Sequence, residues 1–526
     1  MKRDKKERSK LAGTAPDDAA ATEQSTSQTT PAAPRILEGK GKHAKAPAEN
    51  GQTARQKKAK PAAGAAETGA APPPHAHIAG EARLAAGKAL REQVMRQSHG
   101  KWKRDRSHVD PLAILQRSDK GRIERLLPIR YGRMLQSPFT FFRGSAAVMA
   151  ADLEKTPATG LRVQACGDCH LLNFGGFATP ERNILFDIND FDETLPAPWE
   201  WDVKRLVTSF VLAARSNGFS DDDGRDAAVT CARTYRKRLR MYSEMSPLDI
   251  WYARITAEDI IDLAKDERTR DRIKERIAKA SDQNSSELAY PQLAGMVGGQ
   301  IRINDAPPLI YHPEEWTAEE VRSRIEENIQ AYRETLSDDR RELLDRYRVV
   351  DGAIKVVGIG SVGTMCLVIL MMSAANEPLF LQFKEARASV LEPYAGKSLY
   401  AHHGQRVVMG QRLTQPASDV FLGWVTGKGG RIGYVRQLRD AKIKPMVEVM
   451  DADLLTQYAK ACGWVLARAH AKSGDPLTIS GYLGTQDNFD EAMGDFAIGY
   501  ANQAERDHAA LKAAVRAGKI TVHIEE

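Results

Sequence analysis

The chain has 526 residues, of which 42% are hydrophobic and 28% are charged, which excludes a fibrous or wholly disordered protein. No run of about 18 uninterrupted apolar residues is present, and the basic start has no apolar segment behind it, so we expect neither a membrane span nor a signal peptide. Residues 1–60 hold 14 Lys and Arg but only 7 Asp and Glu, so the net charge of +7 lies there. The remaining residues are balanced and give no argument for nucleic-acid binding. Five sparse cysteines favour a reduced, cytoplasmic protein over a disulfide scaffold.

Residues 1–90 are rich in Ala, Pro, Thr, Gln and Lys and show no apolar period, which predicts a disordered basic tail. A solvated tail is the simpler interpretation, and an arm that touches an anionic surface is the alternative. Residues 91–350 are expected to form a mainly helical part, with helical spacing at 146–153, 203–246, 256–280 and 317–347. Two short strands are predicted inside it, at 161–165 and 183–188.

After residue 350 the amino-acid composition and the apolar pattern of the sequence change. Residues 351–440 are rich in Val, Ile, Leu and Phe, are punctuated by Gly and predict a β-rich part. Two of its strand-like runs lie within 419–438. Residues 441–526 return to helical spacing, most clearly at 454–470. The expected fold class is therefore α+β.

The densest chemistry lies around the two predicted strands of the helical part. The first run is Cys166-Gly167-Asp168-Cys169-His170-Leu171-Leu172-Asn173, and about a dozen residues later comes Asp187-Ile188-Asn189-Asp190-Phe191-Asp192-Glu193. Phosphoryl transfer from a nucleotide needs a carboxylate to orient the attacking hydroxyl and oxygen ligands for Mg²⁺. Asp carboxylates and Asn carbonyls are such ligands. An Asp, an Asn five residues later and an Asp on the next hairpin supply this set.

These motifs resemble the catalytic core of the aminoglycoside phosphotransferase and choline-kinase-like enzymes, within the protein-kinase-like superfamily. The resemblance rests on Gly-Asp-x-His-x-x-Asn followed by Asp-Phe-Asp. It implies that Asp168 is the catalytic base, with His170 beside it as a second catalytic candidate. It also implies that Asn173 and Asp190 bind the metal, and that Asp202 is a structural acid. Asp187 and Asp192 are further candidates for metal or substrate binding.

Other interpretations of the same residues stay open. Cys166, Cys169 and His170 fit the C-x-x-C-H pattern of covalent haem, although haem attachment normally follows export. The same three residues could form part of a zinc site, for which the sequence shows no fourth ligand. An Asp- and Asn-rich turn without chemistry is the third alternative. Arg143, which precedes the first strand, could bind phosphate or substrate, or could form a structural ion pair.

A glycine-rich run in the β-rich part is the second candidate site. Val356–Thr364 contains Gly358, Gly360, Ser361 and Gly363, and a β-prone run follows it where a dinucleotide-binding loop would lead into a helix. A third predicted strand ends in Lys384. Glycine lets backbone N–H groups approach phosphates, and a lysine on the third strand can reach them. This order resembles the small nucleotide-clamping lobe of protein kinases, and Glu392 is the candidate acid partner of Lys384. An ordinary hairpin with a surface lysine is the alternative.

In kinases the glycine loop precedes the catalytic loop, whereas here it follows. We therefore expect a circularly permuted, protein-kinase-like, two-lobed fold with the mainly helical catalytic half first. The run from Ser137 to Arg205 also resembles an uncharacterised bacterial family, domain of unknown function 2252, over most of residues 110–510. The predicted function is phosphoryl transfer from ATP with Mg²⁺ to an unidentified hydroxyl acceptor. A nucleotidyl transferase and a nucleotide-binding pseudoenzyme that acts as an interaction module are the alternatives.

Overall fold

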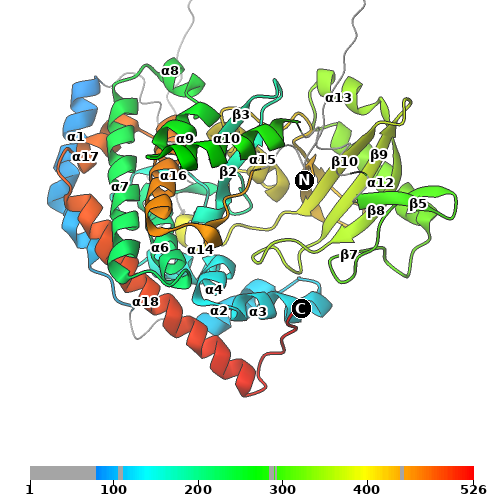
Figure 1. The fold of residues 1–526 in the computed structure, drawn as a ribbon, viewed down its shortest axis with the longest axis horizontal. Helices are drawn as coiled ribbons and strands as arrows, with labels where there is room; N and C mark the ends of the chain where they lie inside the picture. The colour runs from blue at the N-terminus through cyan, green and yellow to red at the C-terminus, as the bar shows by residue number, and fades with distance from the viewer. Residues whose placement is uncertain (1–78, 105–109, 283–289, 291–292, 439–442, 526) are drawn as a thin grey trace, which may run out of the picture. The chain divides into compact units, whose positions relative to one another are not determined.

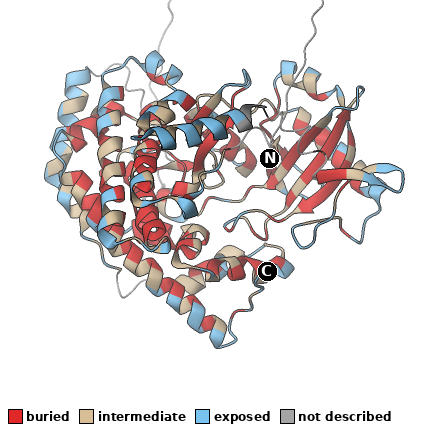
Figure 2. Cartoon of the chain, in the orientation of Figure 1, coloured by how far each residue is buried: buried red, intermediate tan, exposed pale blue. Residues whose placement is uncertain are grey.

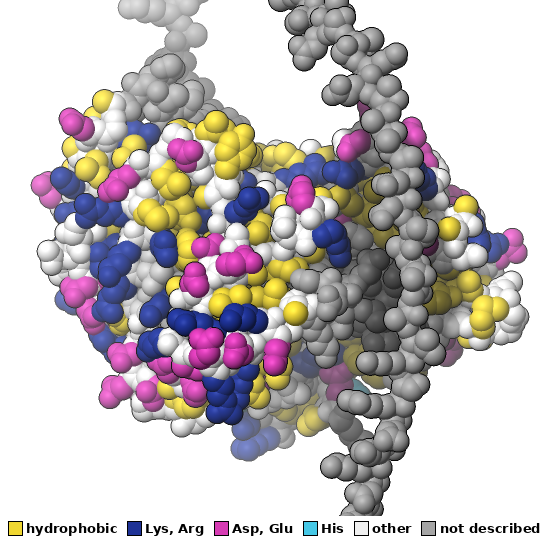
Figure 3. All heavy atoms as spheres, turned by 45° about the horizontal axis from the view of Figure 1, so that its top comes forward, with side chains coloured by type: hydrophobic (Ala, Val, Ile, Leu, Met, Phe, Trp, Pro, Cys, Tyr) yellow, Lys and Arg dark blue, Asp and Glu magenta, His cyan; other side chains and the backbone are white. Residues whose placement is uncertain are grey.

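The structure is a computed structural model that describes residues 79–104, 110–282, 290, 293–438 and 443–525, all within one compact unit, Pro72–Glu526. This part of the chain mixes helices and strands, as the α+β prediction requires. Within these ranges, no helix combines the length and the apolarity that crossing a membrane requires. Acidic and basic side chains alternate over the face shown in Figure 3.

Long helices pack together to form the helical part of the molecule (Figure 1). Its main members are α6 (Trp199–Ser216), α7 (Asp221–Ser243), α16 (Ala452–Ser473), α17 (Pro476–Leu483) and α18 (Asn488–Arg516). Helix α6 is buried along nearly its whole length because α7, α16 and α18 pack against it (Figure 2). Helices α7 and α16 approach closely at Gly463, where a Cβ would lie 2.4 Å from the carbonyl oxygen of Cys231.

Shorter elements surround this bundle. They are α1 (Gly80–Gln93), η2 (Arg96–Gly100), α2 (Pro111–Asp119), η3 (Glu124–Leu126), α3 (Leu127–Leu135), α4 (Pro138–Gly144), α5 (Ala146–Leu153), α8 (Pro247–Tyr252), α9 (Ala257–Leu263), α10 (Glu267–Asp282) and η5 (Val447–Val449). Two small antiparallel pairs lie between α5 and α6. They join β1 (Arg162–Ala165) to β4 (Leu195–Pro198), and β2 (Phe174–Ala178) to β3 (Ile184–Ile188), with η4 (Leu171–Asn173) before β2.

The sheet part is a six-stranded antiparallel sheet in the order β11-β12-β10-β9-β8-β7. Its strands are β7 (Ile310–Tyr311), β8 (Tyr347–Lys355), β9 (Cys366–Ser373), β10 (Pro378–Glu385), β11 (Gly423–Thr426) and β12 (Ile432–Gln437). Helix α12 (Ala318–Arg333) packs against β8 and β11, and the hairpin of β5 (Ala294–Val297) and β6 (Gln300–Ile303) contacts β8. The remaining helices of this region are α13 (Asp338–Leu344), α14 (Glu392–Ala395) and α15 (His403–Thr414).

Most of the predicted elements are confirmed, and their boundaries show where the sequence patterns were too coarse. The predicted strands at 161–165 and 183–188 and the helix at 454–470 match β1, β3 and α16. The helical spacing predicted over 203–246 is confirmed, and it corresponds to two helices, α6 and α7. The chain breaks at Gly218, whose φ of +80° no helix allows, and Ser220 caps the start of α7.

Two expected boundaries also differ from the structure. Helix α1 includes residues that were assigned to the disordered tail, while residues 1–78 of that predicted tail lie outside the described residues. The boundary expected at residue 350 falls inside β8, since β7 and α12 already belong to the sheet part. The reason is physical: α12 buries its apolar face, with Val321, Ile325 and Ile329, against the sheet rather than against the helical part.

Candidate functional site

The segment 166–173, called here the Asp168 segment, is anchored by a buried acid. The backbone turns sharply at Gly167, which has a φ of +83°. Asp202 on α6 accepts hydrogen bonds from the N–H groups of Cys166 at 2.7 Å and Gly167 at 3.1 Å. Nε2 of His470 lies 3.3 Å from the same carboxylate. Asp202 therefore has a structural role and holds the turn that presents Asp168.

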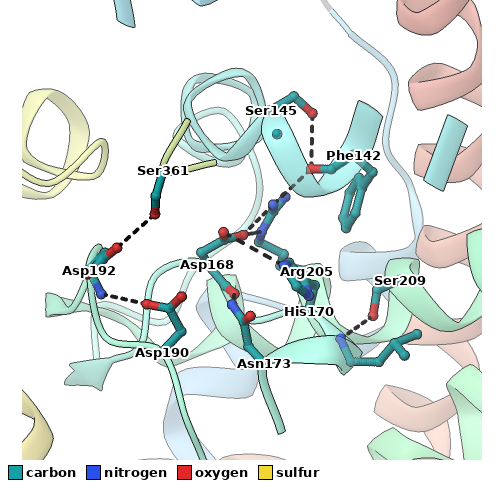
Figure 4. A network of polar contacts seen from close by, with 12 residues as sticks. Phe142, Ser145, Asp168, His170, Asn173, Asp190, Asp192, Arg205, Ser209 and Ser361 are labelled. Carbon is teal, nitrogen blue, oxygen red and sulfur yellow. Dashed lines mark hydrogen bonds and ion pairs between the residues drawn. The ribbon is translucent and has the colours of Figure 1, made fainter. Parts of the chain in front are cut away.

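Asp168 points toward Arg205, which comes from α6 (Figure 4). Nε of Arg205 donates to Oδ1 of Asp168 at 2.7 Å, while Oδ2 lies 3.9 Å from Nε2 of His170. The Asp168 side chain stays 22% exposed, so a ligand can reach it. Burial raises the pKa of Asp168, and the charge of Arg205 opposes this rise. The arrangement fixes one carboxylate oxygen and leaves the other toward the site.

His170 is held neutral by its surroundings. Its side chain is buried, and burial together with the charges of Arg143 and Arg205 lowers its pKa well below the usual range. Its Nδ1 atom finds no hydrogen-bond partner among the described residues. An imidazole whose Nε2 lies beside Asp168 can help to position a polar ligand there, while burial and the nearby arginines disfavour its protonation.

The hairpin of β2 and β3 brings two possible metal ligands to the same place. Nδ2 of Asn173 donates to the backbone oxygen of Asp168 at 2.7 Å, which turns the amide Oδ1 away from that contact. Asp190 follows β3, and its Oδ1 accepts from the N–H of Asp192 at 3.2 Å. Burial and the neighbouring Asp192 raise the pKa of Asp190. Crowded carboxylates beside an oriented amide fit a hard divalent cation, which would relieve this repulsion.

Lys384, on β10 of the sheet part, contacts the acidic segment at the end of β3 (residues 187–193, called here the acidic hairpin). Its Nζ atom lies 2.6 Å from Oδ2 of Asp192, and the ammonium is buried in the sheet opposite Tyr434. The Tyr434 hydroxyl donates to Oδ1 of Asp192 at 2.7 Å. Burial works against ionisation, but the charge of Lys384 and these hydrogen bonds lower the pKa of Asp192 to about 2. The charges of Asp190 and Asp192 in turn raise the pKa of Lys384 well above its usual range, against the effect of burial.

Residues 356–364, called here the glycine segment, close over the same hairpin. The Ser361 hydroxyl donates to Oδ2 of Asp192 at 3.2 Å (Figure 4). Gly358 and Gly363 have positive φ angles of 66° and 87°, and an added Cβ at Gly358 would meet nothing within 4 Å. The other side of the segment is tied down, since Nη1 of Arg122 donates to the Val362 oxygen at 2.5 Å.

A cavity of about 260 Å³ lies where these segments meet. The predicted residues that line it are Asp168, His170, Asn173, Asp190, Asp192, Gly358, Gly360 and Ser361. Lys384 contacts Asp192, and Asp192 lines the cavity. Residues from positions nearly 200 apart in the sequence therefore share one cavity.

Two of the predicted site residues do something else. Asp187 is buried and forms an ion pair with Arg468, whose Nη2 lies 2.6 Å from its Oδ2. Asp187 was a candidate for metal or substrate binding, but its carboxylate has this buried partner and is not among the residues that line the cavity. Glu392 was predicted to pair with Lys384, but the acid that does so is Asp192. Glu392 instead begins the short helix α14, where its carboxylate accepts from the N–H of Ser389 at 3.4 Å.

The cysteines near Asp168 form a group without His170. The ligand atoms of Cys166, Cys169 and Asp202 lie within 4.8 Å of one another, and all three residues are buried. Asp202 already accepts the two backbone N–H groups that hold the turn. Burial raises the pKa of both thiols. These contacts describe a packed support behind Asp168, and His170 faces the cavity instead.

Several residues at the site were not predicted as site residues. Arg205 lies three positions after Asp202 on α6, so helical spacing could have placed both on one face. Glu193 lines the cavity and ends the acidic run that the sequence analysis singled out, whereas Arg122, Arg130 and Arg387 line it without a sequence pattern around them. Their role comes from the fold alone.

The described part of the chain is thus a mixed α and β protein whose acidic, glycine-rich and arginine-bearing segments meet at one cavity. A family model described as "Uncharacterized protein conserved in bacteria (DUF2252)" matches residues 122–514, more than half of the chain. The chain belongs to this family. No curated protein and no solved structure matches it.

Proposed function

We propose that the protein is a Mg²⁺-dependent phosphotransferase that uses ATP and acts on a hydroxyl acceptor, in a circularly permuted kinase-like arrangement. The observation that carries this proposal is the 2.6 Å contact of Lys384 with Asp192, at a cavity also lined by Asp168, Asn173 and Asp190. A cation on a strand, a glycine segment and an acidic hairpin are the parts that phosphoryl transfer requires.

Each part has a chemical role that its surroundings support. Asp168, held by Arg205 through one oxygen, would orient the acceptor hydroxyl with the other. Asn173 and Asp190 would hold Mg²⁺, which when bound would neutralise the phosphate oxygens. Lys384 would exchange part of its contact with Asp192 for a nucleotide phosphate. The open backbone at Gly358 leaves room for phosphate oxygens beside the glycine segment.

The chain order supports the permuted arrangement. The Asp168 segment and the acidic hairpin precede the glycine segment and Lys384, yet all of them reach one site. A permutation keeps the contacts of a fold and changes only where the chain is cut. The Lys384–Asp192 contact supports this arrangement, because one nucleotide would have to touch both Lys384 and Asp190, which stands two residues before Asp192.

The test combines binding with product analysis on the full chain. Thermal stability is measured with ATP alone, Mg²⁺ alone and both together, for wild type, Asp190→Asn and the exposed control Asp262→Asn. Ligand at about 100 times its Kd stabilises by about 2.7 kcal/mol. For a folded unit of about 450 residues this shifts Tm by roughly 3 °C. We expect the shift in wild type and the control only with both ligands, and its loss in Asp190→Asn.

The products separate the proposal from its alternatives. Slow release of ADP that depends on Asp168 and Mg²⁺ supports phosphoryl transfer. Release of pyrophosphate points to nucleotidyl transfer, and a shift without either product points to a nucleotide-binding module. The proposal would be contradicted if wild type had the same melting temperature without ligand and with both ATP and Mg²⁺.

A further inference from the structure

Arg143 is a cationic side chain that lines the cavity and has no hydrogen-bond or ion-pair partner among the described residues. It lies on α4, which is fixed by the capping box of Ser137 and Thr140 and by the buried Phe141 and Phe142. Across the described ranges, Arg143 makes no side-chain hydrogen bond and no ion pair, and its Nε atom is buried without an acceptor. A buried donor without an acceptor costs free energy, so it points to a ligand that supplies one.

Asp168 does not supply that acceptor. Its Oδ1 atom already accepts from Arg205, and the charge of Arg143 acts on Asp168 and His170 from a distance. The structural ion pair that was the alternative interpretation of Arg143 is absent from the described part of the chain. The guanidinium therefore lines the Asp168 side of the cavity with its charge available.

Three further arginines line the same cavity and add to its positive charge. Arg130 pairs with Asp119 at 2.8 Å, and Arg122 lies 3.8 Å from the same carboxylate. Arg387 and Arg122 donate to backbone oxygens rather than to acids; Nη1 of Arg387 reaches the Ser118 oxygen at 3.1 Å. Burial and the charges of Arg130 and Arg387 lower the pKa of Arg122 to about 9. Acids line the cavity as well, among them Glu193, whose charge acts on Arg122, so it is the absence of a hydrogen-bond partner among the described residues that distinguishes Arg143 from the other arginines.

We propose that Arg143, in the cavity that Arg122 and Arg387 also line, binds an oxyanion on the acceptor, either a phosphate monoester or a carboxylate. This inference rests on the proposed phosphotransferase function and names its substrate class. The planar fork of arginine matches both oxyanions through paired hydrogen bonds. The glycine segment comes close to Arg143, since a Cβ at Gly360 would lie 3.8 Å from the Arg143 backbone oxygen. Competition with ADP therefore distinguishes an oxyanion on the acceptor from a phosphate of the nucleotide.

The test uses inorganic phosphate and acetate as probes, titrated by calorimetry into the full chain with saturating Mg²⁺ and ADP. Arg143→Gln removes the charge, and Arg143→Lys keeps it while losing the fork. The matched control is Arg240→Gln, an exposed arginine on α7 that pairs with Glu244. We expect wild type and the control to bind at least one probe, and Arg143→Gln to bind it about 10- to 100-fold more weakly. The probe that binds tells phosphate from carboxylate.

Mg²⁺ with ADP is titrated separately into each variant, and each must keep the melting temperature of wild type within about 3 °C. Should Arg143→Gln fail this criterion, Arg143→Lys is the comparison. Unchanged ADP affinity with weakened probe binding supports the proposal. Three results would overturn the proposal. The probe could compete with ADP, wild type could fail to bind either probe, or wild type and Arg143→Gln could bind the probe equally well. A different result would refute the proposed phosphotransferase function: the probe binds and its binding depends on Arg143, but ADP does not bind at all. The assignment of the oxyanion to an acceptor would then fail too, and Arg143 would remain part of an anion-binding site.

Discussion

The ion pair of Lys384 and Asp192 offers the most direct test of how the two parts of the molecule are joined at the cavity. Lys384→Met removes the charge and keeps most of the side-chain length. Asp192→Asn removes the partner charge and keeps an oxygen for the Tyr434 hydroxyl, which lies 2.7 Å from Oδ1. The two single variants and the double variant form a double-mutant cycle that isolates the interaction.

The magnitude follows from the electrostatics of Asp192. Its pKa falls from 3.8 to about 2, which corresponds to a free energy of about 2 kcal/mol. Lys384 is the largest of the groups that lower it. Breaking a fully buried pair costs about 3–5 kcal/mol, but the Asp192 side chain is 26% exposed, so water screens the charge that is left behind. We therefore expect a coupling free energy of about 2 kcal/mol at pH 7.

The assay is urea unfolding of the four proteins, followed by circular dichroism at pH 7, 5 and 3. Because the pKa of Asp192 is lowered in the folded state, its contribution to stability is complete above pH 3.8 and is lost as the pH falls toward 2. The coupling should be the same at pH 7 and 5 and smaller at pH 3. A coupling below about 0.5 kcal/mol at pH 7, or one that grows as the pH falls, would refute this account of the site.

Three further predictions concern the structure around the site. Arg468→Met leaves the buried Asp187 unpaired and should lower the free energy of unfolding by about 3–5 kcal/mol, and adding Asp187→Asn should restore part of it, as measured by urea unfolding. Gly167→Ala places a Cβ 2.4 Å from the Glu193 oxygen at a φ of +83° and should lower Tm more than Gly160→Ala, where the φ of +79° faces open space. Equal losses would show that the close contact is unimportant. Burial raises the pKa of all five thiols, so a thiol reagent at pH 8 should label them only after unfolding, and rapid labelling of the native protein would contradict their burial.

Local patterns predicted the secondary structure around the cavity well. Alternating apolar residues gave β1 and β3, and glycines before a β-prone run predicted the hairpin of β8 and β9 instead of a strand-to-helix turn. These features depend on the backbone preferences of neighbouring residues. The helical spacing over 203–246 did not show where α6 ends, because the periodicity is similar on both sides of the positive-φ turn at Gly218.

The sequence could not show which acidic and basic side chains form ion pairs with each other. Asp187 and Asp190 stand three residues apart with similar neighbours, yet Asp187 lies in the core with Arg468 and Asp190 lines the cavity. Glu392 was the nearest acid in sequence to follow Lys384, apart from Glu385 beside it, but a fold that packs β10 over the acidic hairpin brings Asp192 closer. Each pairing is decided by packing between elements far apart in the chain.

The sequence by itself determined which residue types could carry the chemistry: an acidic hairpin, an Asp and Asn five residues apart, a glycine segment and a strand lysine. Such choices are local, because they need only the side-chain chemistry and the turn preferences of adjacent residues. Only the tertiary structure decided that Lys384 meets a carboxylate 192 residues away, and that Arg143 faces the cavity without a partner in the described ranges. Electrostatic contacts act over a few ångströms, and the distances between such groups are set by the packing of the whole core.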